Sequence, residues 1–159
     1  MSEQKKKIMV ATDGSKASDN AVRYAAQLTK RRGTSLILFH AISYKKVGYW
    51  GFIDTHFKKE LRAAAGKILD EAEKIAREFD VPFEKMVMED EKLPHMIIAD
   101  ALEELKNIWV LVVGDKGTDL QERRTFGSTT HGVLHELSKR ALPVPILVVP
   151  YVKGVELTV

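Results

Sequence analysis

Apolar runs and amphipathic stretches alternate along the whole chain. Five short runs rich in Ile, Leu and Val are typical of strands, and the stretches between them carry apolar residues three and four positions apart, as helices do. The predicted strands are Ile8–Ala11, Ser35–Ile42, Phe83–Met88, Ile108–Val113 and Ile146–Val149. The predicted helices run from the cap Ser15 to the stop Gly33, from Thr55 to Phe79, from Pro94 to Leu105, and over Ser128–Arg140.

This alternation predicts a doubly wound α/β fold with a five-stranded parallel sheet. All the predicted strands except the third are nearly unbroken apolar runs, which is expected when helices cover both faces of a sheet. The helix that begins at Thr55 has the strongest pattern. Its predicted inner stripe is Phe57, Leu61, Ala64, Ile68, Ala72, Ile75 and Phe79.

Length and composition fit an ordinary globular protein, and we expect one domain over residues 1–159. No apolar run approaches the roughly 20 residues of a membrane-spanning helix. The N-terminus has no signal-peptide core, so we expect a cytoplasmic protein without a membrane partner. The net charge is only +3 and basic residues alternate with acidic ones, which argues against nucleic-acid binding.

Three glycines near the C-terminus indicate a ligand site. Gly114, Gly117 and Gly127 follow a predicted strand, and Gly127 is joined to Ser128 at the start of a predicted helix. A strand that opens into a glycine loop and then a helix can hold phosphate on backbone N–H groups. Neither the P-loop nor the dinucleotide-binding glycine pattern fits this spacing.

The spacing instead resembles the ATP-binding signature of the universal stress proteins, G-x-x-G-x9-G-[ST]. The N-terminal KKIMVATDGSKASDNAVRYA, the run LILFHAI and the closing PVPILVVP resemble segments of the same family, in the same order. The resemblance implies strand order 3-2-1-4-5 and an adenine nucleotide, ATP with or without Mg²⁺. The implied binding residues are Ala11, Thr12, Asp13, Ala41, Gly114, Gly117, Gly127, Ser128 and Thr129.

With that strand order, the glycine motif falls at the topological switch point, where doubly wound folds bind ligands. The loops Thr12–Ser15 and Gly114–Gly127 both end there. The resemblance places adenine and ribose at Asp13 and Ala41, and the phosphates at Gly127, Ser128 and Thr129. Each residue alone also has a structural interpretation: Ser128 as a helix cap, Asp13 as an Asx turn or cap, and the glycines as turn formers.

Two positions depart from the family pattern. Asp115 lies between the first two glycines, where a carboxylate would repel a triphosphate unless Mg²⁺ bridges them or the side chain faces solvent. Ala41 is smaller than the usual valine and loosens the expected adenine wall.

Two further groups of residues could carry chemistry or contacts. His131 and His135 share a helix face, but the zinc-protease glutamate and a third ligand are missing, so we interpret them as surface histidines and expect no metal site. The connection between the second strand and the next helix carries aromatic residues over Tyr44–Phe52. These could cover a ligand or dock a partner, or pack on the sheet edge.

The sequence offers no defensible catalytic base or nucleophile, so we expect at most slow hydrolysis. The favoured hypothesis is a stress-response regulator whose bound nucleotide alters contact with an unidentified protein partner. The alternatives are an adenine-nucleotide hydrolase and a nucleotide-free oligomerisation module.

The last predicted strand would be an exposed apolar edge of the sheet. Both this edge and the resemblance imply a homodimer through Ile146–Val149, and the tail Tyr151–Val159 could cover the partner.

Overall fold

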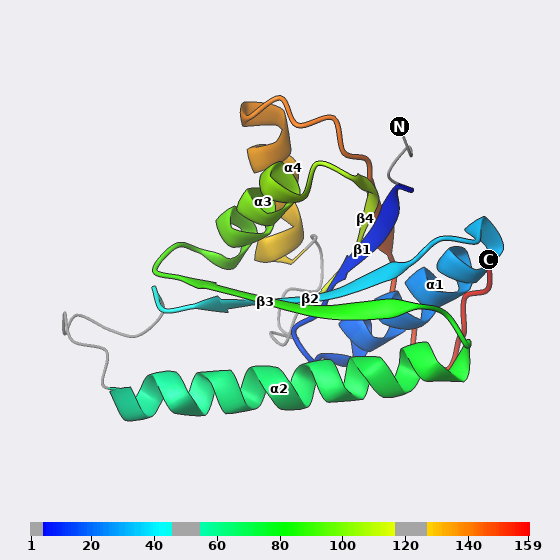
Figure 1. Cartoon of the computed structure of the whole chain (residues 1–159), viewed down its shortest axis with the longest axis horizontal. Helices are drawn as coiled ribbons and strands as arrows, with labels where there is room; N and C mark the ends of the chain where they lie inside the picture. Colours follow the sequence, from blue (N-terminus) through cyan, green and yellow to red (C-terminus); the bar gives the residue numbers. More distant parts are fainter. Residues whose placement is uncertain (1–4, 46–54, 117–126) are drawn as a thin grey trace.

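The computed structural model describes residues 5–45, 55–116 and 127–159. Within these segments strands and helices alternate as the sequence predicts (Figure 1). The strands are β1 (Lys7–Ala11), β2 (Leu36–Ser43), β3 (Phe83–Asp90), β4 (Ile108–Gly114) and β5 (Ile146–Val149). The helices are α1 (Lys16–Arg32), α2 (Thr55–Glu78), α3 (Pro94–Leu105) and α4 (Ser128–Lys139).

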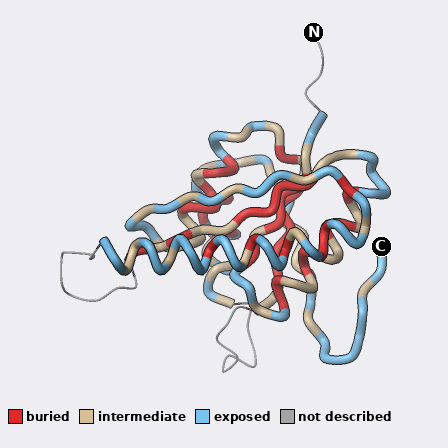
Figure 2. Tube along the Cα trace, turned by 60° about the horizontal axis from the view of Figure 1, so that its bottom comes forward, coloured by how far each residue is buried: buried red, intermediate tan, exposed pale blue. Residues whose placement is uncertain are grey.

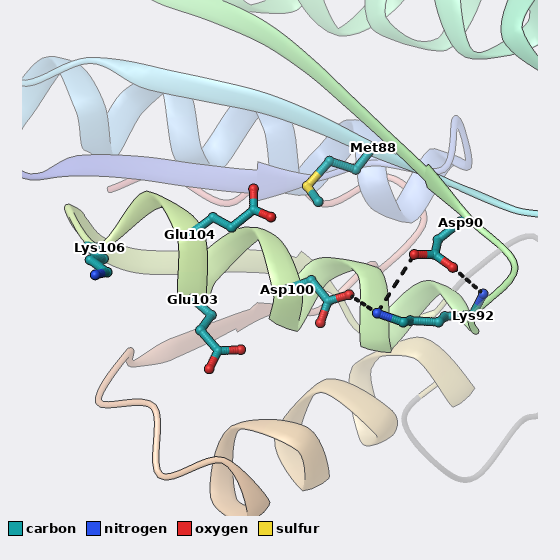
Figure 3. Close-up of a pocket in the computed structure, with 7 residues that line it drawn as sticks. All are labelled: Met88, Asp90, Lys92, Asp100, Glu103, Glu104 and Lys106. Atoms are coloured by element: carbon teal, nitrogen blue, oxygen red, sulfur yellow. Dashed lines mark hydrogen bonds and ion pairs between the residues drawn. The ribbon is translucent and has the colours of Figure 1, made fainter.

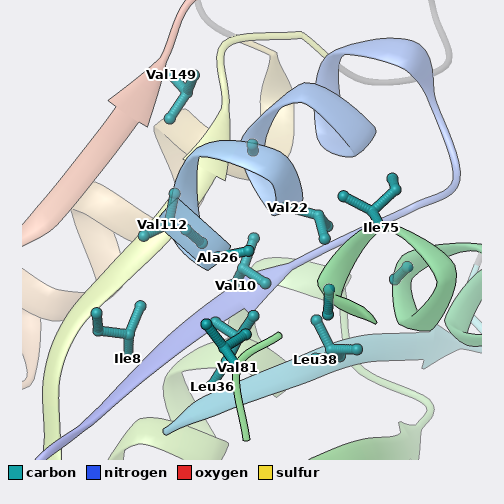
Figure 4. Close-up of a cluster of buried hydrophobic side chains, with 14 of the residues drawn as sticks. Ile8, Val10, Val22, Ala26, Leu36, Leu38, Ile75, Val81, Val112 and Val149 are labelled. Atoms are coloured by element: carbon teal, nitrogen blue, oxygen red, sulfur yellow. The ribbon is translucent and has the colours of Figure 1, made fainter. Parts of the chain in front are cut away.

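The strands form a parallel sheet in the order β3-β2-β1-β4-β5, which confirms the predicted topology. Helices α1 and α2 cover one face, and α3 and α4 cover the other (Figure 1). Each face has its own hydrophobic core. The first contains Ile8 and Val10 beneath Val22 of α1 (Figure 4), and the second joins Met9 to Ile97 of α3.

The two helix ends predicted for α1 are confirmed. The Ser15 side chain accepts a hydrogen bond from the Ser18 backbone N–H, and Gly33 ends the helix with φ 60°. Glycine suits this left-handed position because it lacks a Cβ.

The buried stripe of α2 differs from the predicted one in the N-terminal half of the helix. Ala65 and Leu69 are buried, whereas Ala64 is exposed and Ile68 is half-buried. This segment has two adjacent apolar rows, Ala64 with Ile68 and Ala65 with Leu69. The second row faces β2 and is therefore the buried one. Ala65 packs with Ile42 there.

Strands β2 and β3 continue beyond the end of β1. Ala11 lies opposite Phe39, but β2 and β3 stay paired as far as Ser43 and Asp90. The N-terminal part of α2 covers this extension, where Tyr44 joins a small cluster with Ile42, Ala65 and Leu61.

After β5 the chain turns back over α1 of the same molecule. The Gln27 amide donates to the Leu157 carbonyl at 3.3 Å and accepts from the Val159 N–H at 3.1 Å. Leu157 also packs against the first core. The tail 151–159 therefore contacts its own chain, and its contact with a partner remains a prediction.

Most of the tail remains exposed, while buried residues gather in the strands and in the helix faces that meet them (Figure 2). Within the described segments, each helix is too short or too polar to span a bilayer.

Candidate nucleotide site at the switch point

The turn between β1 and α1 is held by its own hydroxyl groups. Thr12 and Ser18 are buried, and their Oγ atoms lie 3.0 Å apart. The Ser18 hydroxyl donates to the Ser15 carbonyl at 2.9 Å, and the Gly14 N–H donates to the Thr12 hydroxyl at 3.2 Å. The turn is therefore rigid before any ligand arrives.

Asp13 forms the Asx turn that its position allows. Its Oδ1 accepts a hydrogen bond from the Ser15 N–H at 2.9 Å. The residue is exposed, and its second carboxylate oxygen has no hydrogen-bond partner within the described segments. Asp13 thus has one oxygen engaged in the turn and one available to a ligand hydroxyl.

Among the described residues, no side chain caps the N-terminus of α4. Its N-cap is Gly127, and no side chain from the described residues bonds the first N–H groups. By contrast, Ser15 caps α1. Ser128 is exposed and Thr129 half-buried. The first free N–H groups of α4 are therefore available to an anion.

Two hydrogen bonds hold this helix start against the end of β4. The Thr130 hydroxyl donates to the Gly114 carbonyl at 2.9 Å, and the Gly127 N–H donates to the Asp115 carbonyl at 2.8 Å. Among the described residues of the glycine motif, Gly114 and Gly127 therefore lie close together, and the start of α4 lies at the switch point. Gly117 lies outside the described residues.

Gly114 has a packing reason to be glycine. A Cβ at this position would lie 3.0 Å from the carbonyl carbon and oxygen of Ala17, and 3.3 Å from the Ser18 nitrogen. The missing side chain lets the first turn of α1 approach β4. This supports the structural interpretation of Gly114; its approach to a ligand remains a prediction.

Asp115 has a role that neither sequence alternative included. Its Oδ1 accepts a hydrogen bond at 3.1 Å from the backbone N–H of Tyr151, which follows β5. The carboxylate therefore ties the end of β4 to the start of the tail. This contact gives the departure from the family pattern a structural reason.

Ala11 and Ala41 lie half-buried against the same core, on the face covered by α3 and α4. Beside them in sequence, His40 was missed by the sequence analysis. Its Nδ1 lies 2.7 Å from the Thr12 carbonyl oxygen, although the two residues are 28 positions apart. A single histidine within an apolar strand could have indicated a buried polar contact. The sequence spacing could not show that the partner of His40 is the Thr12 carbonyl.

Three further histidines lie on α3 and α4. His131 and His135 are exposed, as predicted. His95 was not singled out, yet it fits against Gly132 of α4 so closely that a Cβ there would lie 2.4 Å from its ring. Burial lowers the pKa of His95.

Only part of the aromatic connection can be placed. Tyr44 is buried and its hydroxyl donates to Glu89 at 2.8 Å, which supports packing rather than ligand contact for this residue. Tyr49, Trp50 and Phe52 lie outside the described residues.

A separate hollow of about 510 Å³ lies between β3 and α3 (Figure 3). It is lined by Met88, Asp90, Lys92, Asp100, Glu103, Glu104 and Lys106. Lys92 pairs with Asp90 and Asp100 inside it. Its lining includes none of the predicted nucleotide-binding residues.

Comparison with known proteins defines the family of this protein. Residues 5–150 match the model of the universal stress protein family, so the chain belongs to that family. No curated protein gives a significant match.

Solved structures share the fold. Universal stress protein UspA from Lactobacillus plantarum is 20% identical with a TM-score of 0.74, over 92% of this chain and 99% of that one. A universal stress protein from Archaeoglobus fulgidus in complex with dAMP is 21% identical, with a TM-score of 0.65 over 90% and 96%. A family member from Arabidopsis thaliana with AMP bound is 14% identical, with a TM-score of 0.59 over 93% of each chain.

Proposed function

We propose that this protein binds an adenine nucleotide between the β1–α1 turn and the N-terminus of α4. The observation that carries the proposal is the start of α4, which no described side chain caps and which is held beside the end of β4 at the switch point. The Archaeoglobus and Arabidopsis relatives, which hold dAMP and AMP, support an adenine nucleotide as the ligand.

The hydrogen bonds of the two loops favour one orientation of the nucleotide. In the β1–α1 turn, the N–H groups of Thr12, Asp13, Gly14 and Ser15 donate to the Phe39 carbonyl, Ser18 Oγ, Thr12 Oγ1 and Asp13 Oδ1 respectively. This turn therefore has acceptors to offer but few donors. Phosphate needs donors, which α4 provides at Ser128 and Thr129.

The nucleoside end accordingly belongs at β1 and β2. The free oxygen of Asp13 can accept a ribose hydroxyl, and the small side chains of Ala11 and Ala41 leave room for the base. We propose Gly117 as part of the loop over the phosphates, as the family resemblance implies.

ATP is the proposed physiological nucleotide, and Mg²⁺ would enter with its phosphates. Mg²⁺ usually keeps several waters and takes its other ligands from carboxylates and substrate phosphates. Within the described residues no three His, Cys, Asp or Glu side chains gather in a way that could hold a metal ion. The nucleotide would therefore supply most of the non-water ligands.

We propose a regulatory role in the stress response, in which nucleotide occupancy changes the contact with a protein partner, and a homodimer through β5. Among the described strands, β5 is one open edge of the sheet, and its Ile146, Leu147 and Val148 are only half-buried. Val152 and Val155, which follow β5 in the chain, are also exposed apolar residues.

Calorimetric titration with AMP and with adenosine tests the orientation. Ser128→Glu places a negative charge at the start of α4, which stabilises the helix but repels phosphate. We expect at least about a tenfold loss of AMP affinity, the equivalent of 1.4 kcal/mol, with little change for adenosine. Ser128→Gln is the neutral control. Equal AMP affinity in the Glu and Gln variants would contradict the phosphate position.

Acid extraction of the purified protein followed by chromatography separates the functional classes. Retained ATP supports the regulatory role, and ADP or AMP supports the hydrolase alternative. Nothing retained, together with no binding of added nucleotide, supports the nucleotide-free module.

A further inference from the structure

The peptide bond between Thr12 and Asp13 is held at both ends by side chains from other elements. Its carbonyl oxygen lies 2.7 Å from His40 Nδ1 of β2, and its N–H donates to Ser18 Oγ of α1 at 3.3 Å. A peptide group is planar. Its C=O and N–H point from opposite edges of the plane, so the two bonds restrain the rotation of the peptide group and hold the backbone that carries Asp13. The Ser15 N–H then holds one oxygen of the Asp13 carboxylate.

Ser18 satisfies the full hydrogen-bonding capacity of its hydroxyl at this point. Its proton goes to the Ser15 carbonyl at 2.9 Å, and its lone pairs face the Asp13 N–H at 3.3 Å, the Thr12 hydroxyl at 3.0 Å and the Ser15 hydroxyl at 3.2 Å. The residue is 4% exposed. Ser18→Ala would leave the Asp13 N–H without its partner and free the Thr12 side chain to turn.

His40 acts from the other side. A carbonyl oxygen can only accept, so Nδ1 of His40 carries the proton in this contact. The amide nitrogen of an asparagine occupies a position similar to Nδ1 and also donates. His40→Asn can therefore keep the bond that His40→Leu removes.

Stability alone does not require both contacts. Helix α1 is already capped by Ser15, and the backbone of His40 is paired with β3 opposite Val87. We propose that Ser18 and His40 are positioning residues that orient the Asp13 carboxylate toward the hydroxyl groups of the nucleoside. This inference rests on the proposed nucleotide site and assigns the two residues that preorganise its nucleoside end.

The test measures AMP affinity by calorimetry and thermal stability for four variants of the full chain. Ser18→Ala and His40→Leu should each lose about tenfold in affinity, the scale expected when a buried donor or acceptor loses its partner. His40→Asn should recover most of the loss. Thr29→Ala is the matched control, because Thr29 is a fully buried hydroxyl of the same helix that bonds only the Ala25 carbonyl at 2.7 Å. It should lose stability and keep its affinity.

Hydrogen exchange at the Asp13 amide gives a second readout. Exchange should accelerate in Ser18→Ala but not in Thr29→Ala. Unchanged exchange, or affinities within about twofold of the unmodified chain, would overturn the inference and leave the nucleotide site standing. Equal affinity losses in Thr29→Ala and Ser18→Ala would reduce Ser18 to a structural role. An unmodified chain that binds no AMP would overturn the site and the inference together.

Discussion

At the scale of single residues, Gly114 and Gly66 have opposite surroundings. Gly114 leaves no room for a methyl group, since a Cβ would meet the backbone of Ala17. Gly66, in the middle of α2, has nothing within 4 Å of the same position. They form a matched pair for testing whether the end of β4 is shaped by packing.

We predict that Gly114→Ala destabilises the protein by about 1–3 kcal/mol, the usual cost of overpacking. Gly66→Ala should stabilise it by about 0.5–1 kcal/mol, because alanine is a better helix former. Urea denaturation measures both. A Gly114→Ala variant as stable as the unmodified chain would show that the contact between α1 and β4 adapts easily.

Residues of the candidate site differ in how far the sequence could reveal them. Asp13, Ser128 and Gly127 lie in motifs whose spacing is local, so the resemblance could identify them. The His40 contact with the Thr12 carbonyl joins residues 28 positions apart and appears only after β1 and β2 pair. The Ser18 contacts with Thr12 and Asp13 span five or six positions within the turn, but no sequence motif marks them. The contact between Asp115 and Tyr151 similarly depends on β4 and β5 being neighbours.

At the scale of elements, helices α3 and α4 meet at His95. Its ring lies against Gly132, and burial lowers its pKa, with His135 and Lys45 adding to the lowering and Glu136 opposing it. A histidine with a lowered pKa in the folded state binds its proton more tightly when the protein unfolds. Stability is therefore lost as the pH falls below the usual histidine pKa of about 6.5.

We predict that His95→Gln flattens the decline in stability below about pH 6.5, since it removes the half-buried titrating group. Thermal denaturation from pH 5 to pH 7.5 measures this. His131→Gln, at an exposed position of α4, is the control and should keep the slope. A His95→Gln variant with the slope of the unmodified chain would show that this contact does not sense protons.

Element positions were predictable because apolar periodicity is set locally. The strands and helices differ from expectation by only a residue or two at their ends, as with β3, which continues to Asp90 rather than ending at Met88. The buried stripe of α2 was partly wrong, since Ala64 and Ala65 are equally apolar and only β2 decides between them.

At the scale of the whole molecule, the sheet has two edges, β3 and β5, among the described strands. The β3 edge carries charged residues such as Glu84 and Lys85, which discourage pairing with another strand. The β5 edge is apolar and continues into exposed Val152. This asymmetry favours β5 as the surface between two copies.

We predict that Val148→Lys converts the proposed homodimer to a monomer, because it places a charge within the β5 edge. Val87→Lys is the control on the opposite edge, at a residue that is 42% exposed, and it should leave the dimer intact. Light scattering at micromolar concentration distinguishes the states. A monomeric unmodified chain would refute the proposed interface.

The central claim is that an adenine nucleotide binds across the switch point, with its nucleoside at β1 and its phosphate at α4. Titration of AMP into the labelled protein, followed by backbone amide NMR, tests it most directly. The account predicts shifts concentrated at Asp13, Gly14 and Ala41 and at Ser128 and Thr129. No shifts at saturating AMP, or shifts confined to the hollow between β3 and α3, would contradict it.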